Sequence, residues 1–478
     1  MEMRHTLSNN MSKRDTAGLR NIDLPIFSIF LALVAIGWLM VYTVSFSREW
    51  SVEGVNFFDT SIGKQTIWIG ICTLVFGVIF IIDWKFWQTF AYLIYGIGGV
   101  MLVAVLFLGT DIKGARAWFS FGGFSFQPSE IAKFGTCLAI SAFLSYYSTN
   151  LKDLRSQWIA FAILALPIAL IMAQPDAGSA IVFFSFLVVL FREGLSPNYY
   201  IIGFYCVAIL ILGIVYLPAD IIVILALIGV FVLAFQFKDK RYWLIVATTL
   251  AVGTIFALNE KEAKIALICV FISFVTLAVI QWRRKRGRVV SLLAIALVLG
   301  AALSIASSYA YDILKPHQKD RITVWLRPQD ADRSGSLYNL YQSKLAIGSG
   351  GLGGKGFLNG TLTKLNYVPE QSTDFIFCTI GEEQGFIGSF GLIALFTLLL
   401  IRITTIAERQ RSNFSRHYAY CVAGILFIHV FINLGMTMGL VPIIGIPLPF
   451  ISKGGSSLLG FTIMMAVLLK LDSNRYRI

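Results

Sequence analysis

Six carboxylates lie between Asp330 and Glu383, in a polar segment (317–388) that separates two long apolar regions. They are Asp330, Asp332, Glu370, Asp374, Glu382 and Glu383. A carboxylate within reach of a hydroxyl can act as a general base, and cations or backbone N–H groups can hold an anionic leaving group. Seven glycines fall between Gly348 and Gly360, with Lys355 among them. We therefore expect the chemistry of this chain to involve the polar segment.

The segment is not typical of a disordered connector. It is far longer than a turn between two helices needs, and it carries apolar side chains that disordered chain lacks. These anchors are Trp325, Leu326, Tyr338, Leu345, Ile347, Phe357 and Tyr367. We interpret the segment as a folded loop.

The glycine stretch GSGGLGGKG, residues 348–356, contains GxGxxG and nearly matches a nucleotide-binding P-loop. However, Ser349 stands where the first glycine of a P-loop belongs, and Gly356 follows Lys355 where Ser or Thr is required. We therefore expect no nucleotide cofactor. Backbone N–H groups with a lysine can still hold a pyrophosphate, which makes Lys355 a candidate substrate-binding residue.

A second polar motif, QPSEIAK, opens an apolar run at residues 127–133. Pro128, Ser129 and Glu130 suit the first turn of a helix, because proline, a capping hydroxyl and an acid all favour its N-terminus. Lys133 is costly one turn into a membrane span unless it is paired or lines a polar cavity. Glu130 and Lys133 share a helix face at i,i+3, so we predict a cavity-lining pair.

Asp176 follows Pro175 in the stretch AQPDAGSA, residues 173–180, at the start of another apolar run. Two interpretations stay open, because an aspartate there can cap the helix N-terminus or line a polar cavity. The two roles are compatible with one another.

The composition excludes an ordinary globular domain. Of the 478 residues, 57% are hydrophobic and 14% are charged, against about 25% charged in soluble domains. The mean hydropathy is +0.76. We therefore predict an all-α polytopic membrane protein, since helices satisfy the backbone in lipid.

The net charge of +13 suits cytoplasmic loops that face anionic lipid, and we expect no nucleic-acid partner. The six cysteines form no CxxC pair, and most lie in apolar runs, where they act as small core residues. The four histidines are widely scattered. These patterns predict no protein-ligated metal site and no disulfide.

The apolar runs predict about fourteen transmembrane helices. They cover residues 23–46, 64–83, 87–109, 129–146, 157–174, 177–193, 199–217, 219–236, 241–258, 264–282, 289–312, 385–402, 418–439 and 454–471. Basic short loops belong in the cytoplasm, and the run RRKRGR at residues 283–288 decides the orientation. Both termini are then cytoplasmic, and the long polar segment is extracellular.

Five regions follow from this pattern. Residues 1–22 form a cytoplasmic tail, and residues 23–198 a six-helix membrane region. Residues 199–312 form a five-helix region with a four-helix insertion. Residues 313–384 form a large extracellular catalytic loop, and 385–478 the last three helices with a cytoplasmic tail. The apolar spans of 199–312 carry no chemical motif, so we interpret them as scaffold or a partner surface.

Several motifs resemble the SEDS family (shape, elongation, division and sporulation) of polytopic membrane glycosyltransferases. The dense match is YVPEQSTDFIF followed by IGEEQGFIG, with QPSEIAK, AQPDAGSA and PLPFISKGGSSLL in the same order. The sequence QSKLAIGSGGLGGKG is similar to that of the elongation branch of the family, RodA. The resemblance implies a ten-helix core, to which this chain adds about four helices.

The resemblance also implies which residues meet the substrate. The family's cavity residues correspond to Arg116, Glu130 and Lys133, and its QPDxGT pattern favours a cavity role for Asp176. Further candidate substrate contacts are Lys355, Glu370, Asp374, Ser452 and Lys453. Lys453 stands where the family commonly has tyrosine, and Ser372 where it often has histidine, so contacts of those rings are absent here.

The family's proposed general base is an aspartate early in the polar segment, which corresponds here to Asp332. Asp332 lies six residues before Tyr338, which matches the family spacing, whereas Asp330 lies closer to Pro328. Spacing alone does not distinguish either aspartate from a solvated loop acid. We expect Asp332 to be catalytic and keep Asp330 as the alternative.

The resemblance implies a peptidoglycan glycosyltransferase of the bacterial cytoplasmic membrane, which polymerises lipid II for cell elongation and shape. Two alternatives remain, a lipid II flippase and a non-catalytic scaffold of a cell-wall synthase complex. The expected cofactor is a divalent cation, Mg²⁺ or Mn²⁺. The expected partners are lipid II, membrane lipid and a class B penicillin-binding protein, because this chain has no SxxK transpeptidase motif set of its own.

Overall fold

The structure is a computed structural model that describes residues 22–49, 56–112, 114–121, 124–235, 247–249, 263–285, 287–332 and 335–476. The chain divides into two compact units. The first comprises Met1–Leu195 and Ala331–Ile478, and the second Ser196–Asp330. Each unit is described by itself below.

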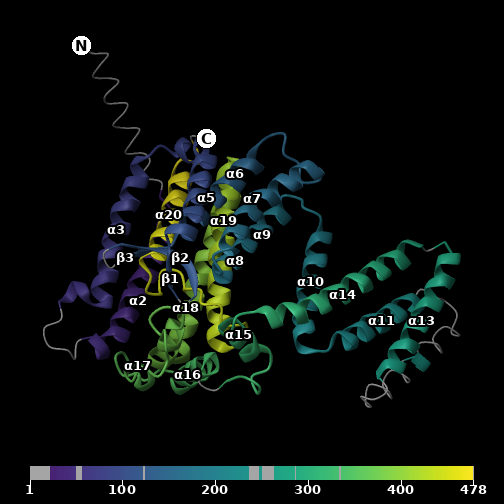
Figure 1. Ribbon diagram of the computed structural model, residues 1–478. Coiled ribbons are helices and arrows are strands. Elements are labelled where there is room, and N and C mark those ends of the chain that lie inside the picture. The colour runs from purple at the N-terminus through teal and green to yellow at the C-terminus, as the bar shows by residue number, and fades with distance from the viewer. Residues whose placement is uncertain are drawn as a thin grey trace, which may run out of the picture. The chain divides into compact units, whose positions relative to one another are not determined.

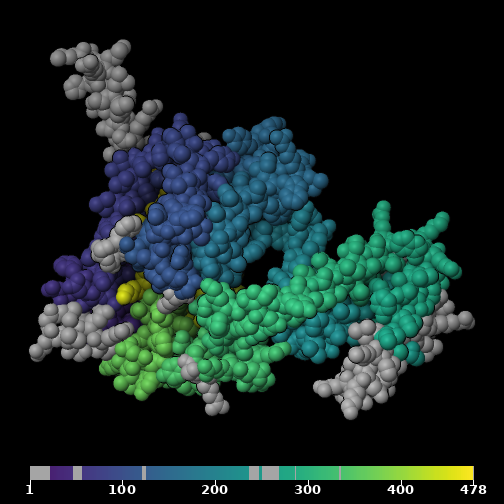
Figure 2. All heavy atoms as spheres, viewed as in Figure 1, coloured from purple at the N-terminus to yellow at the C-terminus, as the bar shows by residue number. Residues whose placement is uncertain are grey.

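The first unit is a bundle of long helices (Figure 1). Its helices are α2 (Leu24–Glu49), η1 (Phe57–Asp59), α3 (Ser61–Ile81), α4 (Trp84–Thr89), α5 (Ala91–Leu108), α6 (Pro128–Ser145), α7 (Leu154–Met172), α8 (Ala177–Val182), η2 (Phe183–Ser185), α9 (Phe186–Arg192), α16 (Ser336–Ser349), α17 (Thr361–Lys364), α18 (Ile376–Arg409), α19 (Asn413–Met438) and α20 (Gly455–Ser473). The most buried of the long helices are α6, α19 and α20, which pack on one another. The side drawn in Figure 2 shows α20 (yellow) largely covered by the N-terminal helices.

The prediction of an all-α fold is wrong in one place. Between α5 and α6 the chain forms a three-stranded antiparallel sheet of β1 (Thr110–Ile112), β2 (Ala115–Phe121) and β3 (Phe124–Phe126). Phe119 pairs with Phe126, and Thr110 pairs with Trp118. Aromatic residues favour strands, and both β2 and β3 are rich in them.

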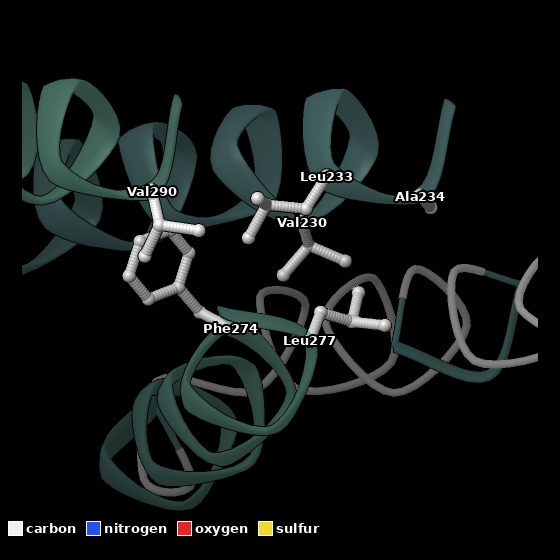
Figure 3. Close-up of a cluster of buried hydrophobic side chains, with 6 residues drawn as sticks. All are labelled: Val230, Leu233, Ala234, Phe274, Leu277 and Val290. Atoms are coloured by element: carbon white, nitrogen blue, oxygen red, sulfur yellow. The ribbon is translucent and has the colours of Figure 1, made fainter. Parts of the chain in front are cut away.

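The second unit consists of α10 (Pro197–Val215), α11 (Pro218–Phe235), α13 (Ala263–Arg283), α14 (Gly287–Ile313) and α15 (Pro316–Leu326). Figure 3 shows part of its core, where Phe274 and Leu277 of α13 face Val230 and Leu233 of α11, with Val290 of α14 beside them. The packing of α10 against α14 is close, and Ser307 Oγ donates to the Leu210 carbonyl at 2.6 Å.

Ten helices in the described part of the chain are long and apolar enough to cross a membrane. They are α2, α3, α5, α7, α10, α11, α14, α18, α19 and α20. Each predicted span outside 241–258 falls on helical residues, although three short elements, α8, η2 and α9, cover 177–193. Of 241–258 only residues 247–249 are described. The largest difference concerns 385–402, because α18 begins at Ile376 and runs to Arg409.

The described residues between α14 and α18 include three helices, α15, α16 and α17, as the apolar anchors indicated. Within the first unit, α16 packs on α18 and α19, and Ser343 Oγ donates to the Thr437 carbonyl at 3.0 Å. The first turns of α18, which include Glu382 and Glu383, belong to the buried part of this unit.

Candidate functional site

A buried charge pair lies at the start of α6. Pro128 and Glu130 occupy the first turn, as the sequence predicted. The capping hydroxyl expected at Ser129 is wrong, because the N-cap residue is Gln127, which makes no side-chain capping bond. Glu130 is 2% exposed and Lys133 is 1% exposed. The Lys133 ammonium lies 2.9 Å from the Glu130 carboxylate. The predicted pair therefore exists, and it is enclosed by protein rather than set in the wall of an open cavity.

A third residue, His429 of α19, completes this group. Its Nε2 atom lies 3.1 Å from Lys133 Nζ, and its Nδ1 atom lies 3.3 Å from the carbonyl of Pro447. The ring of Phe461 in α20 contacts both partners, at 5.3 Å from Lys133 Nζ and 4.9 Å from the His429 ring. Sequence reasoning missed His429, and the available signal was a lone histidine deep in an apolar helix.

Asp176 caps helix α8, which confirms one of its two interpretations. Its carboxylate accepts from the Ser179 N–H at 3.0 Å and the Ser179 hydroxyl at 2.7 Å. It also accepts from Gln127 Nε2 at 2.9 Å. Gln127 immediately precedes α6, so this bond joins the QPSEIAK and AQPDAGSA motifs. Asp176 is half-buried, and its contact with the substrate stays a prediction.

The PLPFISKGG loop is tied to the EQSTDF motif through main-chain groups. The hydroxyl of Ser452 donates to the Thr373 carbonyl at 2.6 Å, and the Lys453 N–H donates to the Ser372 carbonyl at 2.8 Å. Asn433 Nδ2 of α19 donates to the carbonyls of Asp374 and Ile446, at 2.8 and 2.7 Å. The two motifs, about seventy residues apart in sequence, therefore form one structure.

These contacts define the surroundings of three predicted substrate contacts. Ser452 is 3% exposed and its hydroxyl also accepts from the Leu448 N–H at 2.8 Å, so it holds the loop together. Lys453 is half-buried and its ammonium donates to Ser61 Oγ at 2.7 Å. Asp374 is half-buried beside Gly445, whose φ of +82° suits glycine.

The glycine stretch around Lys355 supplies hydrogen-bond partners for the backbone of helix α18 where that helix is interrupted. Gly385 has φ 63° and ψ −157°, which interrupts the helix. The carbonyls of Glu382 and Glu383 accept from the N–H groups of Lys355 and Gly356, at 3.0 and 2.9 Å. Beyond the break, Phe386 and Ile387 donate to the carbonyls of Gly351 and Leu352, at 2.9 and 3.1 Å. We call residues 350–356 with this break the glycine clamp.

The side chain of Lys355 is engaged as well. Its ammonium lies 2.7 Å from Glu382 Oε1 and 2.7 Å from Thr361 Oγ1. The Glu382 side chain is fully buried and accepts from the N–H groups of Leu362 and Thr363, both at 2.9 Å. In this structure the lysine and the N–H groups that suggested a pyrophosphate site bond within the fold. The contact of Lys355 with the substrate stays a prediction.

Three predicted site residues are exposed. Arg116 lies on β2, and Asp332 lies in the segment before α16. Glu370 has φ +58° and accepts from the Thr373 hydroxyl at 2.9 Å. All three lie on the surface rather than among the buried side chains described above. Their proposed roles stay predictions.

A model of the cell cycle protein family of FtsW, RodA and SpoVE matches residues 24–238 and 221–477. The chain belongs to this family. Its curated relatives include the peptidoglycan glycosyltransferase MrdB of Escherichia coli (strain K12), 30% identical over 468 residues that cover 96% of this chain and 97% of MrdB. The peptidoglycan glycosyltransferase RodA of Treponema pallidum is 30% identical over 458 residues, covering 96% of this chain and 98% of that protein.

The family fold is also found among solved structures. A chain from a structure titled "Structural coordination of polymerization and crosslinking by a peptidoglycan synthase complex" aligns with a TM-score of 0.64. The alignment covers 96% of this chain and 99% of that chain, at 22% identity. This likeness shows the fold, and the family model together with the two curated relatives confirms the resemblance of the sequence motifs to this family.

Proposed function

We propose that this chain is a peptidoglycan glycosyltransferase that polymerises lipid II at the outer face of the bacterial cytoplasmic membrane, for cell elongation and shape. The observation that carries the proposal is the near full-length similarity to curated relatives named peptidoglycan glycosyltransferases. The multi-pass helical fold supports it, because the substrate is a membrane lipid.

The reaction joins two lipid-linked sugars. A hydroxyl of one lipid II attacks the anomeric carbon of another, and a new C–O bond forms there. The bond from that carbon to the pyrophosphate oxygen breaks, and undecaprenyl pyrophosphate leaves as an anion. The proton of the attacking hydroxyl passes to a general base, for which we propose Asp332, an exposed carboxylate that can meet substrate.

The topology in this proposal places both termini in the cytoplasm and the segment around α16 and α17 outside, with about fourteen spans in all. One charge cluster supports a common side for three helix ends. Asp23 before α2 accepts from Arg402 and Arg409 of α18, and Arg409 also pairs with Asp472 of α20. Basic residues near these ends favour the cytoplasmic face.

The buried residues position the substrate contacts in this proposal. The Glu130–Lys133 pair, Asp176 and the tied loop at Ser452 and Lys453 lie on one connected framework of α6, α8, α19 and α20. Arg116, Lys355, Glu370 and Asp374 are proposed contacts at its edges. Cations near a leaving pyrophosphate stabilise the transition state.

A divalent cation is proposed to act with the substrate. In the described part of the chain, no group of three His, Cys, Asp or Glu side chains could hold a metal ion, so we derive no step through one. Mg²⁺ often binds mainly to the phosphates of a substrate. A class B penicillin-binding protein is the proposed partner, since one solved neighbour comes from a complex that couples polymerisation and crosslinking.

The test uses the purified full chain, alone and with its class B partner, in detergent with lipid II and Mg²⁺ or Mn²⁺. We expect glycan polymers on a gel. Movement of lipid II across vesicle membranes without any polymer, with or without the partner, would instead identify a flippase. Absence of both activities would favour a scaffold.

A further inference from the structure

The two ring nitrogens of His429 connect two parts of the framework. Nδ1 lies 3.3 Å from the Pro447 carbonyl. Because a carbonyl only accepts hydrogen bonds, Nδ1 must carry the proton in this contact. Nε2 then presents its lone pair to the Lys133 ammonium, 3.1 Å away. The neutral ring thus bridges a lysine of α6 and the main chain of the PLPFISKGG loop.

The bridge reaches a loop that is fixed at its other end by Ser452 and Lys453. These residues bond to the carbonyls of Thr373 and Ser372. Asn433, one helical turn after His429 on α19, bonds to the carbonyl of Asp374. A displacement of Pro447 would therefore move the main chain around Asp374 and Lys453.

The charge balance around Lys133 also depends on the histidine. Lys133 is 1% exposed, and its charge is compensated by Glu130. An ammonium can donate three hydrogen bonds, and the carboxylate of Glu130 and Nε2 of His429 both take part. Removing the histidine acceptor leaves the buried ammonium less well satisfied and free to change its rotamer.

We propose that His429 is a positioning residue for glycosyl transfer, which sets the place of Lys133 relative to the Pro447–Lys453 loop through both ring nitrogens. The proposal rests on the proposed function of this chain. His429 need not touch the substrate. Its effect passes through Lys133 and the loop, so a loss of alignment should lower turnover more than substrate affinity.

Two substitutions separate this role from simple packing. His429→Gln keeps an acceptor for Lys133 and a donor for Pro447 but loses the ring that packs edge-on to Phe461. His429→Phe keeps a ring but loses both nitrogens. We expect His429→Phe to lower kcat by up to about 10²-fold, the usual scale for a misplaced reacting group, with a smaller change in KM, and His429→Gln to retain most of kcat.

His417→Gln is the matched control. His417 is also buried on α19, 1% exposed, but its Nε2 lies 3.2 Å from Glu193. It is twelve residues, or about 18 Å along the helix, from His429. We expect this variant to polymerise lipid II like the wild type. Thermal unfolding of all three variants corrects each rate for the folded fraction.

The outcomes are distinct. Activity in His429→Gln well above that in His429→Phe, at matched folded fractions, supports the positioning role. The positioning role is overturned if the two variants lose activity equally, if His429→Phe is the more active, or if neither loses activity. In each of these cases the activity of the wild type leaves the proposed function standing. A wild-type protein that forms no polymer with its partner removes the proposed function and this role together.

Discussion

The backbone N–H of Lys355 donates to the carbonyl of Glu382 across the break in α18, at 3.0 Å. This bond and its three neighbours replace helical hydrogen bonds that the break at Gly385 removes. Buried backbone groups must be paired. Pairing here requires two segments of the backbone to approach each other more closely than side chains would allow. The glycine clamp therefore requires glycine at Gly350 and Gly354, where a Cβ would lie 2.0 Å from the Gly381 carbonyl oxygen and 2.1 Å from that of Glu383.

The clamp predicts a strong effect of Gly354→Ala. Gly354 has φ +78°, and a Cβ there would lie 2.1 Å from the Glu383 carbonyl oxygen. The left-handed conformation alone costs roughly 1–2 kcal/mol for a residue with a side chain, and the clash adds to it. We expect a lower unfolding temperature in detergent. Gly353→Ala is the matched control, since nothing lies within 4 Å of its Cβ position, and equal destabilisation by both variants would contradict the clamp.

Glu382→Gln should loosen helix α17. The carboxylate accepts from the N–H groups of Leu362 and Thr363 and from the Lys355 ammonium. Hydrogen bonds to a charged group contribute about 1.5–3 kcal/mol, and an amide keeps the shape but loses the charge. We expect lower thermal stability and faster hydrogen exchange at residues 361–364. Glu370→Gln, at an exposed carboxylate, should leave both unchanged, and unchanged exchange in Glu382→Gln would refute this role.

The sequence predicted local features of the fold better than their assembly. Hydrophobic runs located the helices, Pro128 marked the start of α6, and Asp176 was found as a cap, because these signals act within one or two turns. The sheet before α6 was missed, since its strands are only three to seven residues long. The buried contact of Lys133 with His429 was also missed, because it joins residues 296 positions apart.

The polar segment is a second case in which the sequence did not predict a contact between distant residues. Its glycines and lysine suggested ligand binding, yet Lys355 bonds to Glu382, and Gly350 and Gly354 closely approach the backbone of α18. Close approach to a helix backbone and close approach to a phosphate both require residues without side chains, so the same glycines suit either. Only the three-dimensional arrangement distinguishes them.

Acid should weaken the charge cluster at Asp23. Burial of Asp23 raises its pKa, but hydrogen bonds from Arg402, the Ile26 N–H and Arg409 outweigh this effect and lower the pKa overall. A lowered pKa stabilises the fold above the ordinary aspartate value of about 4, and the stabilisation is lost as the pH falls below it. We expect the unfolding temperature to drop between about pH 5 and pH 3.

Asp23→Asn gives the comparison for that experiment. The variant cannot titrate at this position, so its unfolding temperature should start lower at neutral pH and fall less on acidification. Identical pH profiles for the two proteins would mean that Asp23 contributes nothing to the acid sensitivity. The mutation should not alter lipid II binding, because Asp23 pairs with Arg402 and Arg409 near the C-terminal end of α18, away from the proposed substrate contacts.

Asp332→Asn tests the proposed base. Asparagine keeps the size and hydrogen bonding of the side chain but cannot take the proton of the attacking hydroxyl. We expect lipid II polymerisation to fall by roughly 10²–10⁴-fold, the usual contribution of a general base. Thermal stability should be unchanged, since Asp332 is exposed and surface substitutions usually alter stability by less than about 0.5 kcal/mol.

Asp330→Asn is the control, because Asp330 is the other aspartate that the spacing allows. We expect it to retain most of the activity, measured as polymer formed per minute at saturating lipid II. The reverse result, with Asp330→Asn inactive and Asp332→Asn active, would transfer the role of base to Asp330 and leave the glycosyltransferase function intact. Full activity in both variants would mean that neither aspartate accepts the proton. The next candidate for the base would be the carboxylate of Asp374, which lies beside Gly445. The hydrogen bond from Asn433 Nδ2 to the main-chain carbonyl of Asp374 holds this residue in place.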